Sequence, residues 1–358
     1  MSKLTTAAEA VAALLKDETV AEVMIDGPER VYVERKGKLE DTGICFASER
    51  EVVDWANGLL ALHGWEPVGE GRFWVEGRLA DGSRTVVVIP PVAVNGPHVV
   101  IRKFSNYPIT FEQLLEWGCI NQSILDFFHV IMQSRLNVLV SGGTNSGKTT
   151  LLNCLTGLMP PEERLIAVES QHELRIRHER VVYLEAEAAQ ASGADQVGLD
   201  DLLRVAAHMR PDRLIVGELR GTEVVEVIRL MNLGYEGAVT LIHANSPRDA
   251  LARLETMATI AEPSLTLPAI RAEIASALNL IIQQTRLEDG SRRVTSIAEV
   301  QDLKGDNIVL EEIFVWEKTG VDQGGRFVGK HRATGAVPSF VPRLAARGLT
   351  FPKEMFEA

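Results

Sequence analysis

A run of small and hydroxyl side chains that ends in lysine and threonine lies before the middle of the chain. It matches the pattern G-x-x-x-x-G-K-[ST] and consists of Gly142, Gly143, Thr144, Asn145, Ser146, Gly147, Lys148 and Thr149. Glycines in this pattern allow backbone N–H groups to surround a phosphate without a Cβ in the way. We expect the Lys148 ammonium to reach the β and γ oxygens of ATP and the Thr149 hydroxyl to bind Mg²⁺. The sequence therefore predicts a nucleotide site.

The runs on either side of this motif support that prediction. The strand-like run NVLVSG precedes it, and a helix-like run opens at Thr149 and Thr150 and continues through Leu152. The N-terminus of a helix offers partial positive charge and free N–H groups, both of which favour a phosphate. We therefore expect Thr150 to belong to the same site.

Two further strand-like runs end in carboxylates, which nucleotide hydrolysis needs in order to hold Mg²⁺ and orient water. RLIAVES carries Glu169, with Glu173 four residues later, and DRLIVGE ends with Glu218. Because parallel strands place their carboxyl ends at one edge of a sheet, we expect these acids near the phosphates. We assign Glu169 as the general base or water-orienting carboxylate and Glu218 as the acid that supports Mg²⁺. Gly217 stands where such a strand would otherwise carry an aspartate.

A fourth strand-like run, VTLIHAN, places His243 at the same edge of the predicted sheet. An imidazole there could hydrogen-bond a γ-phosphate and respond to its loss. A single histidine at a strand end is more often structural, so the residues alone leave both roles open.

The order of the elements predicts two domains. In the second part of the chain, strand-like runs alternate with the helix-like segments LDDLLRVAAHM and TEVVEVIRLMNL, which is typical of parallel βαβ units. The first part has short alternating runs between turn signals, and one helical stretch over residues 49–62. We therefore predict an α/β protein with a smaller α+β domain over residues 1–106, a linker over 107–118 and a nucleotide-binding domain over 119–358.

The cysteines and the apolar runs bear on where the protein works. Cys45, Cys119 and Cys154 form no C-x-x-C pair, and we expect them to be buried thiols of a reducing compartment. No run approaches 18 apolar residues, and the N-terminal segment has the pattern of a capped amphipathic helix rather than a signal peptide. Any contact with a membrane is therefore expected to be peripheral or through partner proteins.

The sequence gives no strong signal for binding nucleic acid. A net charge of −12 over 358 residues disfavours broad, non-specific binding to a polyanion. The aromatic residues Trp65, Phe73 and Trp74 could stack on bases, but we expect them to fill the core of the small domain.

Metal and dinucleotide sites of other enzyme classes are also disfavoured. QHELRIRH contains His172, Glu173 and His178, but a zinc protease helix needs its second histidine where this chain has Ile176. The turns between strands and helices carry no G-x-G-x-x-G pattern, so a dinucleotide cofactor is not indicated.

Four segments in a fixed order resemble the boxes of a known superfamily. GGTNSGKTTLLN, RLIAVESQHEL, MRPDRLIVGELRGTE and GYEGAVTLIHANSPRDALARLE are similar to the Walker A, Asp, Walker B and His boxes of the type II/type IV secretion ATPases. The closest resemblance is to the CpaF-like motors of tight-adherence pili. It extends to the N-terminal segment EVMIDGPERVYVERKGKLE and to the C-terminal segment GRFVGKHRATGAVPSFVPRLAARGLTFPKEMF.

This resemblance implies a RecA-like ATPase domain, a homo-hexameric ring, and ATP bound between the two domains. It implies that Arg84 and Arg102 of the N-terminal domain approach the phosphates, where an arginine finger accelerates hydrolysis by on the order of 10³ to 10⁵. It favours the sensor role of His243 and offers Arg220 as a weaker candidate for a contact between subunits. On the residues alone, Arg84 and Arg102 would be ordinary exposed strand residues.

Three positions depart from the pattern of that superfamily. Ser170 stands where the Asp box has its aspartate, Tyr235 replaces the first histidine of the His box, and Glu187 stands where arginine is common. The first change removes an acid near Mg²⁺, and the second leaves His243 as the only imidazole of its box. These departures bear on the rate of hydrolysis and on the assignment to pili.

We predict a cytoplasmic, Mg²⁺-dependent ATPase that acts at the inner membrane through platform proteins and powers assembly of a tight-adherence pilus or type II/type IV secretion. Two alternatives stay open. One is a nucleotide-gated scaffold with little turnover, which Ser170 and Tyr235 favour, and the other is a conjugative-transfer ATPase that serves DNA export. The pair Glu169 and Glu218 disfavours the scaffold, because a protein that only binds nucleotide does not need both.

Overall fold

The computed structural model describes residues 6–35, 38–103, 109–186 and 197–357. The chain divides into two compact units, Met1–Tyr107 and Pro108–Ala358. Glu187, one of the positions that departs from the family pattern, lies outside the described residues. Within the described ranges, no helix combines the length and the apolar character that crossing a bilayer requires.

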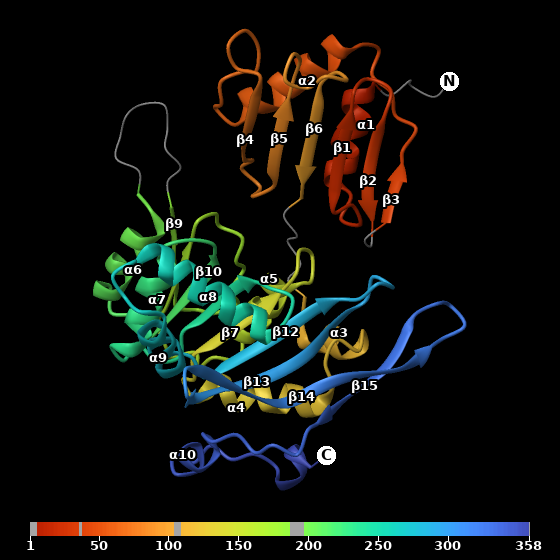
Figure 1. The fold of residues 1–358 in the computed structure, drawn as a ribbon. Helices are drawn as coiled ribbons and strands as arrows, with labels where there is room; N and C mark the ends of the chain where they lie inside the picture. The colour runs from red at the N-terminus through yellow and green to blue at the C-terminus, as the bar shows by residue number, and fades with distance from the viewer. Residues whose placement is uncertain (1–5, 36–37, 104–108, 187–196, 358) are drawn as a thin grey trace. The chain divides into compact units, whose positions relative to one another are not determined.

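The first unit is a six-stranded antiparallel sheet in the order β3-β2-β1-β6-β5-β4, with two helices (Figure 1). The strands are Glu22–Asp26 (β1), Val31–Arg35 (β2), Lys38–Asp41 (β3), Trp74–Arg78 (β4), Arg84–Val88 (β5) and His98–Arg102 (β6). The helices are Ala7–Lys16 (α1) and Glu49–Leu62 (α2). The short strands between turns and the helix over residues 49–62 that the sequence predicts are confirmed.

One face of this sheet forms the core of the first unit. Val23, Ile25 and Val33 are fully buried, because alternate residues of a strand point to the same face, and Val52 and Leu60 of α2 pack among them. Ser48 caps the N-terminus of α2, because its hydroxyl accepts a hydrogen bond from the backbone N–H of Glu51.

Two expectations about burial are wrong for one residue each. Trp65 and Phe73 pack against the core, but Trp74 is 59% exposed, because β4 buries its neighbour Val75 and turns Trp74 to the other face. Cys119 and Cys154 are buried, whereas Cys45 is exposed in the irregular segment between β3 and α2.

The second unit is built on a nine-stranded sheet in the order β15-β14-β13-β12-β7-β11-β10-β8-β9. Strands from β12 to β9 in this order run parallel, and β13, β14 and β15 extend the sheet by antiparallel pairing. The strands are Val138–Gly142 (β7), Leu165–Glu169 (β8), Val181–Glu185 (β9), Arg213–Leu219 (β10), Val239–His243 (β11), Leu280–Arg286 (β12), Arg292–Lys304 (β13), Asn307–Val321 (β14) and Phe327–Ala333 (β15).

Helices cover both faces of this sheet (Figure 1). They are Phe111–Glu116 (α3), Gln122–Gln133 (α4), Lys148–Thr156 (α5), Leu199–His208 (α6), Glu223–Asn232 (α7), Pro247–Ala261 (α8), Leu267–Ala277 (α9) and Val341–Ala345 (α10), followed by the 3₁₀ turn Lys353–Phe356 (η1). Val138 and Val140 belong to a core with α4 and α5, while Leu139 between them belongs to a second core with α6 to α9.

The parallel strands β7, β8, β10 and β11 and the helices α6 and α7 lie where the sequence predicts them, and the α/β class is confirmed. Strands β9 and β12 to β15 had no counterpart among the predicted runs. Strands β12 to β15 nearly double the width of the sheet. The expected linker over 107–118 contains α3, whose Leu114 is buried in the core of the second unit.

A buried ion pair lies at the start of the central strands, away from the glycine-rich motif. Arg213, the first residue of β10, has no exposed side-chain surface, and its guanidinium pairs with Glu163. Arg135 also contacts Glu163, with 2.8 Å between Nη2 and Oε1. Burial lowers the pKa of Arg213, and the Glu163 carboxylate opposes this shift. Gly237 leaves room for the arginine, because a Cβ there would lie 2.8 Å from its Nη1.

Replacing Glu163 with glutamine is therefore expected to destabilise the second unit by about 3–5 kcal/mol, since it removes the carboxylate that pairs with the buried Arg213 guanidinium. The exposed neighbour Glu162 provides a matched control, because Glu162→Gln makes the same chemical change at the surface and should alter stability by less than about 0.5 kcal/mol. Urea unfolding followed by circular dichroism measures both. Equal midpoints for the two variants would contradict the assignment.

Candidate nucleotide-binding site

Residues 142–149, here called the P-loop, connect the buried strand β7 to helix α5. Their backbone takes conformations that the glycines allow. Gly147 has a φ of 95° and Asn145 a φ of 58°, both in the left-handed region. A Cβ on Gly142 would lie 2.2 Å from the backbone oxygen of Gln284 and 2.5 Å from the Ser146 hydroxyl. A side chain at position 142 would therefore displace the loop.

The N-terminus of α5 is suited to an anion. Gly147 is its N-cap residue, and no side chain of the described residues caps the first turn. The free N–H groups of this turn and the helix dipole both attract negative charge. Thr149 and Thr150 are half-buried in the same turn, where sequence analysis placed them. The loop and the helix thus form a cradle that fits a phosphate group.

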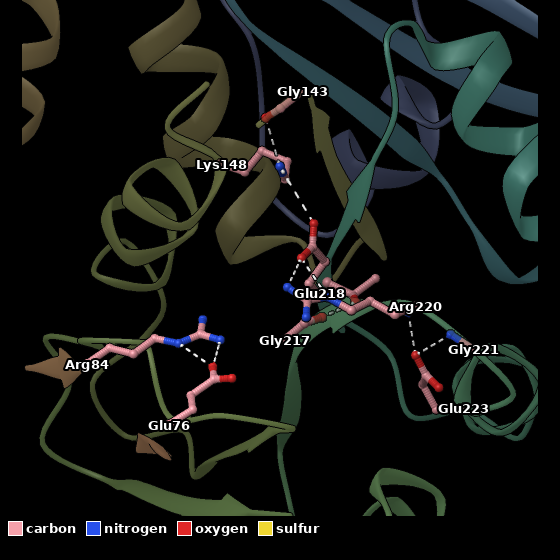
Figure 2. Close-up of polar contacts among 10 residues, drawn as sticks. Glu76, Arg84, Gly143, Lys148, Gly217, Glu218, Arg220, Gly221 and Glu223 are labelled. Carbon is pink, nitrogen blue, oxygen red and sulfur yellow. Dashed lines mark hydrogen bonds and ion pairs between the residues drawn. The ribbon is translucent and has the colours of Figure 1, made fainter. Parts of the chain in front are cut away.

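Lys148 is directed into this site and is largely buried. Its Nζ donates to the Gly143 carbonyl at 3.0 Å and lies 3.7 Å from Oε1 of Glu218 (Figure 2). Burial lowers the pKa of the ammonium, and the Glu218 charge opposes this effect. A single carboxylate at this distance compensates the buried charge only in part, so a phosphate would be a favourable additional partner.

Glu218 lies between two cations. Its Oε2 accepts hydrogen bonds from Arg220, at 2.9 Å from Nε and 2.6 Å from Nη2, on the side away from Lys148 (Figure 2). The pairing of β10 with β11 shifts register between Val216 and Glu218, so Gly217 forms an irregularity in the strand. Such irregularities re-aim the side chains that follow them. This local geometry directs Glu218 towards Lys148.

Glu169, at the end of β8, is buried, and both of its oxygens are occupied. Oε1 accepts from the backbone N–H groups of Glu173 and Leu174 at 2.9 Å each, and Oε2 lies 2.9 Å from Nδ1 of His172. A Cβ on Gly217 would lie 3.2 Å from Cγ of Glu169. The glycine that stands in place of an acid therefore gives Glu169 its space. In this conformation Glu169 holds the loop after β8 together.

His243 lies beside the P-loop by strand pairing. It is the last residue of β11, and its register partner on β7 is Gly142. His243 is half-buried. Within the described ranges, its ring makes no hydrogen bond. Of the residues that depart from the family pattern, Ser170 is exposed after β8. Tyr235 is half-buried and packs against the core, and its hydroxyl donates a hydrogen bond to the carbonyl of Ala207 at 3.1 Å.

Arg84 and Arg102 belong to the first unit, where they are register partners on β5 and β6. Both are exposed. The Arg84 guanidinium pairs with Glu76 on β4 (Figure 2). Arg102 is also opposite Glu22 on β1; burial raises the pKa of that glutamate, and Arg102 opposes the rise. The structure therefore brings the two predicted arginines next to each other within their own unit.

Two site residues escaped sequence analysis. The Nε of Arg292 donates to the carbonyl of Asn145 at 3.0 Å. The amide nitrogen of Gln284 would lie 3.3 Å from a Cβ on Gly147. Both come from β12 and β13, more than a hundred residues after the motif, and no local pattern marks them.

The donors present fit Mg²⁺ as a companion of a nucleotide rather than as a metal bound by protein alone. In the described ranges, no three histidine, cysteine or acidic side chains gather as a metal site. Thr149 and Glu218 offer the hard oxygen ligands that Mg²⁺ prefers, and this ion usually takes one or two protein ligands together with phosphates and water.

Comparison with known proteins identifies relatives across most of the chain. The family described as "Type II/IV secretion system protein" matches residues 5–334. A Mycobacterium tuberculosis protein named "Putative conjugal transfer protein" is 33% identical over 309 residues, which cover 85% of this chain and 86% of the relative. Conjugal transfer protein TrbB of Rhizobium radiobacter is 29% identical over 301 residues, covering 83% and 88%. The structure of the ATPase DotB of Legionella pneumophila shares the fold, with a TM-score of 0.59, 18% identity, and coverage of 82% and 80%.

Proposed function

The chain belongs to the type II/IV secretion system protein family, and we propose that it is an ATPase that drives one of these machines. The observation that carries this proposal is the meeting of Lys148 and Glu218 at the P-loop, 3.7 Å apart, beside the uncapped N-terminus of α5. Phosphoryl transfer needs a cation that binds the phosphates and a carboxylate that helps to hold the Mg²⁺ bound to them.

The proposed roles follow from the positions of the side chains. The P-loop N–H groups and Lys148 bind the β and γ phosphates of ATP, and Thr149 and Glu218 hold Mg²⁺, which would neutralise charge on those phosphates. His243, next to Gly142, contacts the γ-phosphate and responds to its release. For Glu169 to orient the attacking water, one of its present hydrogen bonds to His172, Glu173 or Leu174 must open.

We further propose a homo-hexameric ring in which charged residues complete the site. Arg84 and Arg102 would supply positive charge to the phosphates, and Arg84 would have to leave Glu76 in order to do so. Arg220 would likewise leave Glu218 to contact a neighbouring subunit. Counting subunits by mass photometry, with and without a non-hydrolysable ATP analogue, tests this assembly. A protein that stays monomeric under both conditions would contradict it.

The transport role has two candidates. We propose that the protein powers assembly of a tight-adherence pilus from the cytoplasmic side of the inner membrane, through platform proteins. Conjugal DNA transfer is the second candidate, because two relatives across most of the chain carry that name. Deleting the gene separates them: loss of surface pili supports the first, and loss of plasmid transfer with pili intact supports the second.

A steady-state assay with ATP and Mg²⁺ tests the enzymatic proposal. We expect turnover that is lost when EDTA removes the metal, and that is faster in the assembled fraction than in monomers. ATP binding without measurable turnover in the assembled ring would instead support the nucleotide-gated scaffold. Absence of any affinity for adenine nucleotides would refute both.

A further inference from the structure

The side chain of Arg292 contacts both left-handed residues of the P-loop. Its Nε donates to the carbonyl of Asn145 at 3.0 Å, and its Cδ would lie 3.2 Å from a Cβ on Gly147. These two residues have φ values of 58° and 95°. Arg292 is the first residue of β13 and is exposed.

This contact bears on how the loop would meet a phosphate. A non-glycine residue in the left-handed conformation is unfavourable by itself and persists when its surroundings hold it. The Asn145 carbonyl accepts a hydrogen bond from the charged Arg292 side chain, so its oxygen points towards Arg292. The same oxygen turned towards a phosphate would repel it. Arg292 therefore favours the loop conformation in which N–H groups rather than carbonyls face the anion.

Strand pairing connects the backbone of Arg292 to the strand that begins the P-loop. Arg292 pairs with Arg286 across β13 and β12, and Gln284 of β12 pairs with Gly142 of β7. Gln284 is buried, and its backbone oxygen leaves no space for a side chain on Gly142. The arginine is thus fixed to the strand that begins the P-loop through two adjacent ladders of hydrogen bonds.

We propose that Arg292 is a positioning residue of the nucleotide site, which holds the P-loop in the conformation that binds the β-phosphate. This inference rests on the proposed nucleotide-binding function. Because the P-loop cradles a phosphate that ADP and ATP share, loss of Arg292 weakens the binding of both nucleotides by the same factor.

The test compares Arg292→Gln with Arg326→Gln. Both changes remove one positive charge from an exposed position, and Arg326 lies in the turn between β14 and β15, with no hydrogen bond to the P-loop among the described residues. Isothermal titration calorimetry on the full chain measures the dissociation constants of ADP and of a non-hydrolysable ATP analogue. We expect Arg292→Gln to weaken both by about 10-fold, as for loss of a hydrogen bond from a charged donor, and Arg326→Gln to leave both unchanged. The thermal midpoint without nucleotide should be the same for the two variants.

Three outcomes would overturn the inference. Equal affinities for the two variants would show that the contact with Asn145 has no effect on binding. A loss confined to the ATP analogue would indicate a contact with the γ-phosphate instead. Full recovery of affinity in Arg292→Lys would assign the effect to charge alone, since we expect lysine to leave affinity reduced. Absence of ADP binding by the folded parental protein would refute the proposed function itself, which separates the two failures.

Discussion

ATP turnover is expected to fall by at least about 100-fold when Lys148 is replaced by alanine. Among the described residues, the Lys148 ammonium is the one cation that belongs to the P-loop. It donates a hydrogen bond to the Gly143 carbonyl at 3.0 Å. Its alanine variant would leave the phosphates without this charge at the moment when negative charge shifts towards the leaving oxygen. Nucleotide affinity should fall as well, because Lys148 would bind the phosphates of the ground state too.

Two further variants separate this effect from unfolding and from net charge. Lys304→Ala removes a charge from an exposed position at the end of β13 and should leave turnover unchanged. Lys148→Arg should be nearly as inactive as Lys148→Ala, because a planar guanidinium does not fit a buried site shaped for a compact ammonium. A coupled-enzyme assay measures all three, and near-parental turnover in Lys148→Ala would remove Lys148 from the mechanism. Without nucleotide, the thermal midpoint of Lys148→Ala should be no lower than that of the parental protein, because burial disfavours the charged form of this lysine.

The geometry of the candidate nucleotide site could be predicted because its main parts are local. The P-loop is contiguous, and the strand and helix that flank it have patterns that do not depend on distant residues. The placement of Glu218 and His243 needed only one further rule, that parallel strands end at the same edge of a sheet. The structure follows this rule, with His243 beside Gly142 and Glu218 facing Lys148.

The contacts that sequence could not predict depend on register and on exact conformation. Gly217 looked like a missing acid, but its significance comes from the irregular pairing of β10 and from the space that Glu169 occupies next to it. The hydrogen bonds of Glu169 depend on the path of the loop after β8. Arg292 reaches the P-loop only because β12 inserts between β13 and β7, and no pattern in either strand specifies that order.

The pairing of the two arginines of the first unit could not be predicted from local sequence patterns either. Family resemblance selected Arg84 and Arg102, and strand pairing explains why they go together, since they are directly opposite on β5 and β6. Neighbouring like charges are unfavourable unless something compensates them. Glu76 compensates Arg84, and Glu22 is opposite Arg102. An anionic ligand such as a phosphate would be a further way to relieve the repulsion.

Replacing Glu218 with glutamine is expected to separate binding from hydrolysis. The amide keeps the shape of the side chain and one oxygen but loses the charge between Lys148 and Arg220. Affinity for ATP should stay the same or rise, because a negative charge near the phosphates is removed. Turnover should fall by on the order of 100-fold or more, because the proposed role of this carboxylate is to support Mg²⁺ during hydrolysis.

The ATP dissociation constant and the steady-state rate are both measured in Glu218→Gln and in a control variant that loses the same charge. Glu236→Gln serves as that control, because Glu236 is exposed in the turn after α7. Arg220→Gln adds a second comparison: it frees Glu218 from its two hydrogen bonds and should change the rate far less than Glu218→Gln does. Parental turnover in Glu218→Gln would leave Glu218 as a structural partner of Lys148 and Arg220, and the carboxylate that supports hydrolysis would have to be Glu169, released from the loop that now binds it.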